Sequence, residues 1–435
     1  MKYIAISELS KYIGQTVTLH GWVHALRDQK HVQFLILRNR TGSVQVVHEK
    51  TGALAERVSA LTRESAISIS GRVVENPGVR LGGVEIQLAE LRVVNVAEAP
   101  LPLDPFSENA SGIDHRLDWR HLDLRVPSNR LIFEIQTAVE MAMREYWMRN
   151  HFIEIHSPKL MGTASESGAE LFALPYFNST AYLAQSPQFY KQMAMASGFD
   201  RVFEIAPVFR ADPSFTSRHT TEFTSVDVEI AWIDGHEDVM AFEEQWLQHV
   251  IYTVREKYGD AIAENYGVEL AVPALPFPRI AMDEALAVLS EQGHMPDREG
   301  DLDPKGERLI GEYIRKTRGC DYVFVIDYPV SVRPFYHMRH SEHSDLTRSF
   351  DLLYRGVEIT TGAQREHRPD VLRAQAREKG LDLEVIQFYL DFFKYGCPPH
   401  GGFGFGLSRL LMVMLGLPSV RETTFLSRTP NRLHP

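Results

Sequence analysis

The chain has 435 residues but only two cysteines, Cys320 and Cys397. Two cysteines are too few for a disulfide framework, and they fit a reducing compartment. The sequence also lacks a signal peptide and any apolar run of about 18 residues or more, the length that a membrane-spanning helix needs. These absences predict a cytoplasmic protein without a membrane segment.

An excess of positive charge is missing too. Lysine and arginine number 46 against 57 aspartates and glutamates, so the formal net charge is −11. That balance argues against a general nucleic-acid coating protein, although a specific nucleic-acid site needs only a local basic patch. The sequence contains no internal repeat or low-complexity tract, and its length predicts two or three domains of about 150 residues each.

Three glycines alternate near the end of the chain. Gly402, Gly404 and Gly406 recur with a period of two, and Arg409 follows them. Alternate residues of an extended strand share one face, so these glycines predict a face without side chains, onto which a flat group such as a nucleobase could be laid. The alternative is a tight bend packed closely against another backbone. We expect Arg409 at the point where this strand gives way to an apolar helix, Leu410–Leu415.

Two segments upstream, Phe203–Asp212 and Arg218–Trp232, have the composition of strands and are joined by a loop rich in turn formers. They predict a long antiparallel hairpin. Its inward face carries a dense set of ionisable residues: Arg210, Arg218, His219, Glu222 and Asp227. Buried charge is costly unless it is paired or faces a ligand. A polyanion such as ATP, with a magnesium ion, would fit these residues.

Apolar residues recur at helical spacing in two further segments. They predict a helix over Leu131–Asn150 and a second one that starts near Val239 and ends at Gly259. The charged segment Arg368–Glu378 predicts a solvated helix face. The region Leu270–Gly319 predicts one or two helices and nothing more specific.

Three of these segments resemble the class II aminoacyl-tRNA synthetases. The hairpin resembles their motif 2 (about 203–232), and the glycine strand with Arg409 resembles their motif 3 (about 400–415). The first long helix and the following Phe152–Pro158 resemble motif 1 (about 131–160), and the proline falls where the family builds its dimer interface. The resemblance therefore implies a homodimer.

Two other segments narrow the resemblance within the class. Gln185–Gln192 and Gly356–Arg365 are similar to aspartyl-tRNA synthetases, and the resemblance covers essentially the whole chain. The interval between Trp232 and Gly401 leaves little room for the large extra domain of bacterial members, so the chain resembles the compact archaeal and eukaryotic-type subgroup. The resemblance implies that ATP activates L-aspartate to aspartyl-adenylate, which is transferred to the 3′ end of tRNA(Asp). Whether tRNA(Asn) is also charged stays open.

Five short β-like segments predict a small barrel at the N-terminus: Val17–Val23, Val32–Leu37, Val44–Val47, Ala66–Val74 and Val84–Leu88. The barrel resembles the OB-fold that reads the anticodon in this subgroup. We therefore predict an α+β protein in three parts. These are an OB-fold anticodon-binding domain (1–98), a proline-stiffened linker (99–118) and a class II catalytic domain with an antiparallel sheet flanked by helices (119–435).

Within the barrel, the resemblance implies an anticodon-binding set of Arg27, Phe34 and Gln45. Phe34 would stack on a base and Gln45 would hydrogen-bond to one, a division of labour typical of single-stranded RNA recognition. The alternative is that Phe34 fills the barrel, since apolar strand residues are usually core. The loops at 28–32 and 76–80 are expected to decide whether tRNA(Asn) is accepted.

Displacement at a phosphoryl centre depends mainly on positioning the reactants and neutralising the phosphate charge. We therefore expect arginines and magnesium to be the main groups of the ATP site. The resemblance implies two catalytic residues, Arg210 between the α-phosphate and the attacking carboxylate, and Arg409 against the adenine and the γ-phosphate. The implied ATP-binding set is Arg210, Asp212, Arg218, His219, Thr220, Phe223, Glu358, Gly406, Leu407, Ser408 and Arg409. Mg²⁺ would be held by Asp351, Glu358 and Thr361.

The side-chain carboxylate of the substrate requires cations. Arg365 can grip it with a planar fork and Lys191 can add a point charge, an arrangement suited to rejecting a neutral amide. Glu166 matches the family position that binds the substrate ammonium, and Gln188 helps to shape the pocket. The implied aspartate-binding set is Glu166, Gln188, Lys191, Arg210, Thr361 and Arg365.

Three alternatives compete with this interpretation. The sister enzyme asparaginyl-tRNA synthetase shares the architecture but would not be expected to carry the Lys191 pattern. A synthetase-like paralogue without aminoacylation activity would usually lack a motif arginine or a metal ligand, whereas Arg210, Arg409 and Glu358 are all present. A general OB-fold RNA-binding protein would leave the catalytic-domain residues unexplained.

Overall fold

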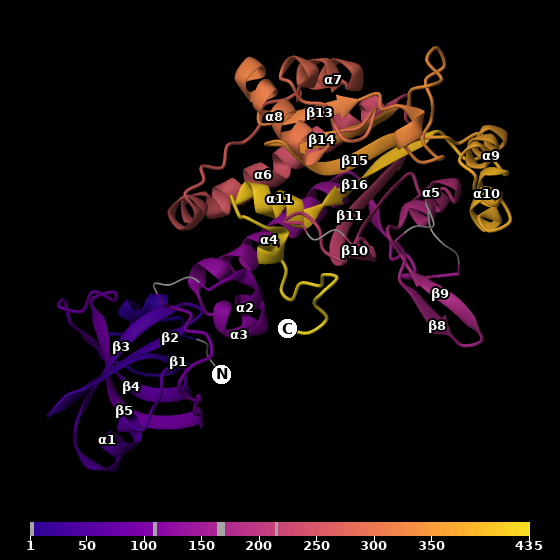
Figure 1. The fold of residues 1–435 in the computed structure, drawn as a ribbon. Helices are drawn as coiled ribbons and strands as arrows, with labels where there is room; N and C mark the ends of the chain where they lie inside the picture. The colour runs from indigo at the N-terminus through magenta and orange to yellow at the C-terminus, as the bar shows by residue number, and fades with distance from the viewer. Residues whose placement is uncertain (1–3, 108–110, 163–169, 214–215) are drawn as a thin grey trace. The chain divides into compact units, whose positions relative to one another are not determined.

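The computed structural model describes residues 4–107, 111–162, 170–213 and 216–435 (Figure 1). The chain divides into two compact units, Met1–Ala110 and Ser111–Pro435. Each unit has an apolar core of its own. In the ranges described, no helix combines the length with the apolar character of a membrane span.

The first unit is a closed barrel of five strands in the order β1-β2-β3-β5-β4. The strands are β1 (Thr16–Asp28), β2 (Val32–Asn39), β3 (Gly42–Glu49), β4 (Ala66–Glu75) and β5 (Val84–Asn95). A short 3₁₀ helix, η1 (Ile6–Tyr12), precedes them, and α1 (Gly52–Ser59) connects β3 to β4. Alternate strand residues such as Leu35, Leu37 and Val46 fill the interior, as the pleat of a strand requires. The predicted barrel of five strands is confirmed.

The chain that leaves the barrel remains packed on it. The Asp104 carboxylate accepts two hydrogen bonds from the Arg63 guanidinium, at 2.9 and 3.0 Å. The Phe106 ring contacts the His24 ring edge-on at a centroid distance of 4.6 Å, and the Arg38 guanidinium lies 4.4 Å from its centroid. Leu103 is buried. Residues 103–106 therefore pack as part of the barrel unit and do not form a separate linker.

The second unit is built on an eight-stranded sheet in the order β12-β13-β14-β15-β16-β11-β10-β6. Its strands are β6 (Ile153–Glu154), β10 (Arg201–Phe209), β11 (Glu222–Ala231), β12 (Arg279–Ala281), β13 (Tyr322–Ile326), β14 (Ser349–Tyr354), β15 (Val357–Arg365) and β16 (His400–Gly406). The pairs β12–β13 and β10–β6 are parallel and the others antiparallel, so the sheet is mixed. A second, three-stranded sheet has the order β7-β9-β8, from β7 (Leu160–Met161), β8 (Ala173–Tyr176) and β9 (Ser179–Leu183).

Helices surround this sheet, as predicted for an α+β catalytic domain. They are α2 (Ile113–Asp118), α3 (Arg120–Asp123), α4 (Pro127–Arg149), α5 (Gln188–Ala196), α6 (His236–Tyr266), α7 (Met282–Glu291), α8 (Pro304–Arg318), α9 (Pro369–Glu378), α10 (Gln387–Phe393), α11 (Leu407–Met414), η2 (Val330–Val332) and η3 (Val420–Thr423). α6 and α11 pack against β15, and α4 packs against α6 (Figure 1). Trp147 of α4 stacks on Trp246 of α6 at 5.1 Å, deep in the core that the sheet and these helices share.

The predicted end of the second long helix at Gly259 is wrong. α6 continues to Tyr266, and the glycine that ends it is Gly267, whose backbone has the left-handed φ of 67°. A glycine within a helix costs only about 1 kcal/mol relative to alanine. The buried apolar face of α6 outweighs that cost, so the helix passes through Gly259.

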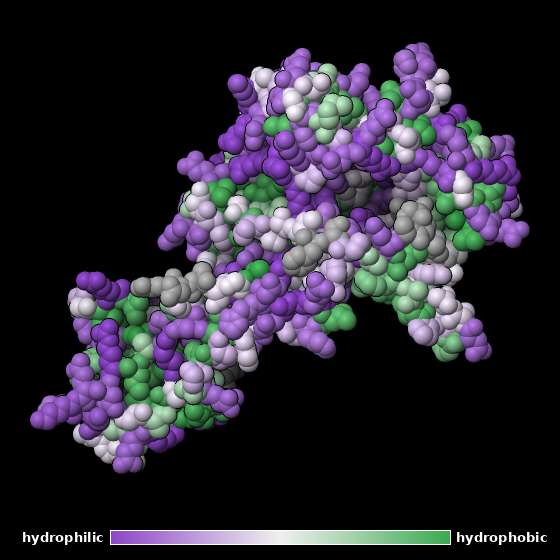
Figure 2. All heavy atoms as spheres, viewed as in Figure 1, coloured by the Kyte–Doolittle hydropathy of each residue, from purple (hydrophilic) through white to green (hydrophobic). Residues whose placement is uncertain are grey.

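The face drawn in Figure 2 is mainly hydrophilic over the second unit. Apolar side chains gather there around α10, where Phe388 and Phe392 are exposed. The predicted charged helix near 368–378 is present as α9, which still buries Leu372 and Ala376 on its inner face.

Candidate active site

A cavity of about 380 Å³ in the second unit opens beside β11, β15 and β16. Its wall includes many of the predicted site residues: Gln188, Arg210, Asp212, Arg218, His219, Thr220, Phe223, Glu358, Thr361, Arg365, Gly406, Ser408 and Arg409. Asp227 and Gly404, predicted with the charged face of the hairpin and with the glycine face, lie there too. Other residues on the wall were not predicted as site residues: Glu170, Ser186, Ser225, Pro334, Tyr336, His337, Ile359, Phe405 and Val420. The sets predicted for the nucleotide and for the amino acid thus meet in one cavity.

Some predicted residues lie elsewhere. Lys191 and Leu407 are each only 1% exposed and are not on the wall; the Leu407 side chain packs in the core. Asp351 of β14 is buried, pairs with Val325 of β13 and is also absent from the wall. Glu166 falls outside the described residues.

The hairpin that supplies much of the wall is shorter than predicted. β10 ends at Phe209, which pairs with Glu222 at the start of β11. The described residues between them lie outside both strands, so their consecutive side chains are no longer forced onto opposite faces of a sheet. This departure allows Asp212, Arg218 and His219 all to line the cavity.

Arg210 is fixed where the hairpin opens. Its backbone N–H donates to the Thr221 carbonyl at 2.9 Å, and its guanidinium lies 5.3 Å from the centroid of the Phe223 ring, a cation–π distance. Burial lowers the pKa of the nearby His219, and the cation Arg409 acts in the same direction. Arg210 lowers this pKa as well, so two cations act on the same place in the cavity, which suits a site for an anion.

Arg409 belongs to the helix and not to the strand before it. α11 begins at Leu407, not at Leu410 as predicted, so Arg409 stands in its first turn. One Nη1–H of Arg409 donates to the Glu358 carbonyl at 3.0 Å, and Nη1 lies 3.3 Å from Oε2 of the same glutamate. The junction of strand and helix therefore holds Arg409 against β15.

The predicted glycine face is only partly correct. A Cβ atom on Gly402 would lie 2.0 Å from the Val228 carbonyl oxygen, so this glycine allows β16 to approach β11 closely and is absent from the cavity wall. Gly404 and Gly406 do line the cavity. The bare face thus runs over the last two of the three alternating glycines.

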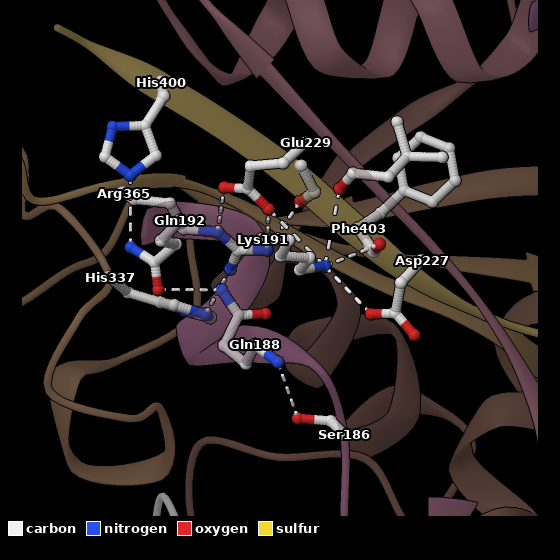
Figure 3. Close-up of polar contacts among 12 residues, drawn as sticks. Ser186, Gln188, Lys191, Gln192, Asp227, Glu229, His337, Arg365, His400 and Phe403 are labelled. Carbon is white, nitrogen blue, oxygen red and sulfur yellow. Dashed lines mark hydrogen bonds and ion pairs between the residues drawn. The ribbon is translucent and has the colours of Figure 1, made fainter. Parts of the chain in front are cut away.

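A buried network of four alternating charges lies at one end of the site (Figure 3). Lys191 Nζ lies 3.0 Å from Asp227 Oδ1 and 3.4 Å from Glu229 Oε2. Arg365 Nε donates to Glu229 Oε1 at 3.0 Å, and Arg365 Nη2 donates to the Gly402 carbonyl at 2.9 Å. Pairing two cations with two anions offsets the cost of burying them.

His337 touches this network and was not predicted. Its Nε2 lies 3.1 Å from Arg365 Nη1. Burial lowers the pKa of His337 well below its ordinary value, and Arg365 reinforces the shift, so the neutral ring accepts a hydrogen bond from the guanidinium. A single histidine in an irregular segment carries no spacing signal, which is why the sequence did not reveal it.

Glu307 of α8 was also missed. Its Oε2 accepts hydrogen bonds from Arg218 Nη1 and from the Glu358 backbone N–H, both at 2.8 Å. Burial raises its pKa to about 7, and the neighbouring Glu358 acts in the same direction. A Cβ atom on Gly311 would lie 2.5 Å from the Gly356 nitrogen, so α8 lies directly on the turn between β14 and β15. Gly311, four residues after Glu307 and on the same helix face, is the one signal that the sequence held.

Arginines pair with both carboxylates that were predicted as magnesium ligands, Glu358 and Asp351. Although burial raises the pKa of Glu358, Arg409 and Arg333 lower it below its ordinary value. The Thr361 hydroxyl donates to Glu358 Oε1 at 3.1 Å. Asp351 Oδ2 lies 2.7 Å from Arg333 Nη2. In the part of the chain that the structure describes, no three His, Cys, Asp or Glu side chains are grouped as metal ligands.

The predicted anticodon residues lie on the outside of the barrel. Phe34 is half-buried and pairs in register with Arg27, whereas the next residue, Leu35, is 3% exposed in the barrel core. The alternative in which Phe34 fills the barrel is therefore wrong. Gln45 Nε2 donates to Glu85 Oε2 at 2.9 Å on the neighbouring strand.

Comparisons with known proteins agree with both units. The family described as tRNA synthetases class II (D, K and N) matches residues 112–430, and the family described as OB-fold nucleic acid binding domain matches residues 17–94.

Relatives resemble the chain over its whole length. An aspartate–tRNA(Asp) ligase of Thermococcus kodakarensis is 44% identical over 99% of this chain and 98% of its own length. An aspartate–tRNA(Asp/Asn) ligase of Aeropyrum pernix is 41% identical over the same shares. Among solved structures, asparaginyl-tRNA synthetase of Pyrococcus horikoshii with asparaginyl-adenylate superimposes with a TM-score of 0.91 at 32% identity, covering 100% of both chains.

Proposed function

The chain belongs to the class II tRNA synthetases of the D, K and N group and is an aminoacyl-tRNA ligase, and we propose that its amino acid is L-aspartate. It uses ATP to form aspartyl-adenylate and transfers the aspartyl group to the 3′ end of tRNA(Asp). The observation that carries the choice of aspartate is Arg365, a buried cation on the cavity wall that shares an ion-pair network with Lys191.

Arg365 suits an acidic substrate because a guanidinium has only donors. A carboxylate side chain turns only acceptor oxygens toward this cation, whereas the amide of asparagine is neutral and carries an NH₂ group in place of one oxygen. Glu229 and the Gly402 carbonyl hold the guanidinium plane, so it is ordered before the substrate enters. Because the guanidinium is held in one orientation, Arg365 can discriminate between the side chains of aspartate and asparagine, which are nearly equal in size.

The first step requires the α-carboxylate of aspartate to attack the α-phosphorus of ATP, with pyrophosphate leaving. Arg210 is the group that would bridge the attacking carboxylate and the α-phosphate, and its stacking on Phe223 fixes it before the reaction. Arg218 and Arg409 would neutralise charge on the outer phosphates. All three arginines line the same cavity, which supports these roles.

The residues present fit a magnesium ion. Mg²⁺ is commonly held by one or two carboxylates together with substrate phosphates, so a three-carboxylate cage is not required. Glu358, on the cavity wall, would be the ligand next to ATP, with Asp351 and the Thr361 hydroxyl as its predicted partners. When bound, the ion would neutralise phosphate charge.

The second step uses the tRNA, whose anticodon would bind the outer face of the barrel around Phe34, Arg27 and Gln45. The match of residues 17–94 to a nucleic-acid-binding family supports this role. Relatives are named for tRNA(Asp) alone and for tRNA(Asp/Asn), so the choice between one and two tRNAs is the open part of the proposal.

We also propose a cytoplasmic homodimer that pairs through the segment 131–160. Four apolar residues of this segment are exposed in the single chain: Met141 at 61%, Met148 at 64%, Ile153 at 48% and Leu160 at 47%. Met141 and Met148 lie seven residues, or two turns, apart on α4 and therefore on one face of it. A second copy seated on this face would remove them from water.

The test is aminoacylation with labelled aspartate on tRNA(Asp) and tRNA(Asn) transcripts, together with ATP–pyrophosphate exchange with aspartate and with asparagine. Exchange with aspartate and charging of tRNA(Asp) are expected. Exchange with asparagine alone would replace the proposal with the sister enzyme, and no exchange with either amino acid would favour a paralogue without aminoacylation activity. Charging of both tRNAs would identify a non-discriminating enzyme.

A further inference from the structure

A second buried network, made of uncharged groups, runs beside the four charges (Figure 3). Gln188 and Gln192 stand one turn apart on α5, and Gln188 Nε2 donates to Gln192 Oε1 at 2.9 Å. Gln192 Nε2 lies 3.1 Å from His400 Nε2, and His400 Nδ1 lies 2.8 Å from the Pro398 carbonyl oxygen. Gln192 and His400 are fully buried, whereas Gln188 reaches the cavity wall.

The direction of every hydrogen bond in this network follows from its last member. A carbonyl oxygen can only accept, so His400 Nδ1 carries the proton that points at Pro398. Burial lowers the pKa of His400, so the ring is neutral and Nε2 is left as an acceptor. Gln192 must therefore offer its NH₂ group to His400 and its oxygen to Gln188.

A second donor agrees with this direction. The Tyr389 hydroxyl donates to Gln192 Oε1 at 3.1 Å, so that oxygen receives hydrogen bonds from both Tyr389 and Gln188. If the Gln192 amide were reversed, its oxygen would face the lone pair of His400 Nε2 and its NH₂ group would face that of Gln188, although the Tyr389 hydroxyl could accept as well as donate. Buried donors and acceptors without partners are unfavourable, so the reversed arrangement is disfavoured.

The consequence reaches the substrate cavity. With its NH₂ group committed to Gln192, Gln188 turns its carbonyl oxygen away from Gln192, toward the side of Asp227 (Figure 3). We propose that His400 and Gln192 are positioning residues that fix the amide of Gln188, so that its oxygen is an acceptor for the ammonium group of the amino-acid substrate. This inference rests on the proposed function, because it deepens the same site.

The chemistry of the surroundings favours an ammonium at this point. Asp227 also lines the cavity and adds carboxylate oxygens: Oδ2 accepts a hydrogen bond from Ser225 and Oδ1 one from Lys191, and each can accept a further one. An ammonium group has only donors, so it suits a place where Gln188 and Asp227 both present acceptors. A reversed Gln188 would present an NH₂ group and repel it.

The experiment uses the full-length protein with Gln192→Met and His400→Phe, each of which breaks the chain of hydrogen bonds. ATP–pyrophosphate exchange is measured with aspartate varied at saturating ATP, and then with ATP varied. Both variants are expected to raise KM for aspartate by about tenfold to a hundredfold, which corresponds to the loss of one hydrogen bond to a charged group. KM for ATP should stay within about twofold. The double variant should raise KM for aspartate no more than Gln192→Met alone, because both changes break the same chain of hydrogen bonds.

Two further measurements separate positioning from general damage. Succinate has both carboxylates of aspartate but no ammonium group, so its inhibition constant should be the same for the variants and for the unaltered enzyme. Tyr389→Phe removes a single hydroxyl and serves if the larger changes impair folding; it should raise KM for aspartate by about twofold to tenfold. Gln33→Met, which removes a buried glutamine from the barrel core, is the matched control and should leave exchange unchanged.

The results distinguish this inference from the function on which it rests. If the unaltered enzyme fails to exchange with aspartate, the proposed function falls. Suppose instead that it exchanges, but the variants raise KM for ATP as much as KM for aspartate, or raise the inhibition constant of succinate as much as KM for aspartate. The network is then only structural and the inference is overturned.

Discussion

Arg218 Nη1 lies 2.8 Å from Oε2 of Glu307, although 89 positions separate the two residues in the chain. Both side chains are largely buried, with exposed fractions of 13% and 10%. The same carboxylate oxygen accepts a hydrogen bond from the backbone of Glu358. Glu307 thus connects the arginine proposed for the outer phosphates to the strand that carries the proposed magnesium ligand.

Glu307→Gln tests whether this contact prepares the ATP site. Glutamine keeps the size of the side chain and an acceptor oxygen but cannot take up the negative charge that Glu307 carries above its pKa of about 7 and that holds Arg218. We expect KM for ATP to rise by about threefold to tenfold while KM for aspartate is unchanged, measured by ATP–pyrophosphate exchange with each substrate varied. Glu312→Gln, at an exposed position of the same helix, is the control. Equal changes in both constants would contradict the positioning role.

The example of Glu307 also shows where sequence reasoning reached its limit. Strands of the barrel and the residues around Arg210 and Arg409 could be predicted because their spacing and turn formers are local in the sequence. Glu307 could not, since its role depends on α8 lying against the β14–β15 turn; Gly311 marks a close approach on that face of the helix but does not show which segment approaches. His337 failed to stand out for the same reason.

Boundaries were less predictable than elements. The glycine run predicted a strand followed by a helix, but the helix begins at Leu407, because this residue stands three and four positions before Leu410 and Leu411 and is buried with them. Gly402 was assigned to a ligand face, whereas its lack of a side chain serves the approach of β11. Composition marks where glycines matter, but only the register of neighbouring strands decides what each one faces.

Arg365→Lys tests the choice of aspartate. Lysine keeps the positive charge but loses the planar fork, so the contact to Glu229 and the orientation of the donors are both weakened. We expect KM for aspartate to rise by about tenfold to a hundredfold with little change in KM for ATP. Arg315→Lys, at an exposed position of α8, should be without effect. Unchanged aspartate kinetics in Arg365→Lys would remove the observation on which the substrate proposal rests.

Phe34→Ala tests the proposed anticodon face. Stacking of a base on an aromatic ring contributes about 1–3 kcal/mol, so charging of tRNA(Asp) should fall about tenfold or more. Exchange without tRNA should remain nearly intact, because Phe34 belongs to the barrel unit and the cavity to the other. Val94→Ala, at an exposed barrel position, is the control. If exchange fell together with charging, the assignment of Phe34 to anticodon reading would be wrong.

Met148→Asp tests the proposed homodimer. A charge placed where a second copy would bury a methionine should separate the subunits, because an unpaired charge in an interface is strongly unfavourable. Light scattering after gel filtration should show one subunit for Met148→Asp and two for Met295→Asp, a matched change at another exposed methionine. A dimeric Met148→Asp protein would place the interface elsewhere.

Glu243 makes the stability of the catalytic unit depend on pH. It is fully buried on α6, and burial, reinforced by Glu244 and Asp351, raises its pKa from 4.5 to about 8, although the Thr360 hydroxyl acts in the opposite direction. Between these two values the folded protein keeps a proton that the unfolded chain releases, so the free energy of unfolding falls as pH rises. The slope from this group is about 1.4 kcal/mol per pH unit.

Glu243→Gln replaces the carboxyl with a neutral group that cannot release a proton. We expect it to stabilise the protein more at pH 8 than at pH 5, measured as the free energy of unfolding in urea at both values. Glu264→Gln, at an exposed position of the same helix, should change stability equally little at both. An equal gain for Glu243→Gln at the two pH values would mean that the carboxyl titrates near its ordinary value, and α6 would then have to admit water at this point of the core.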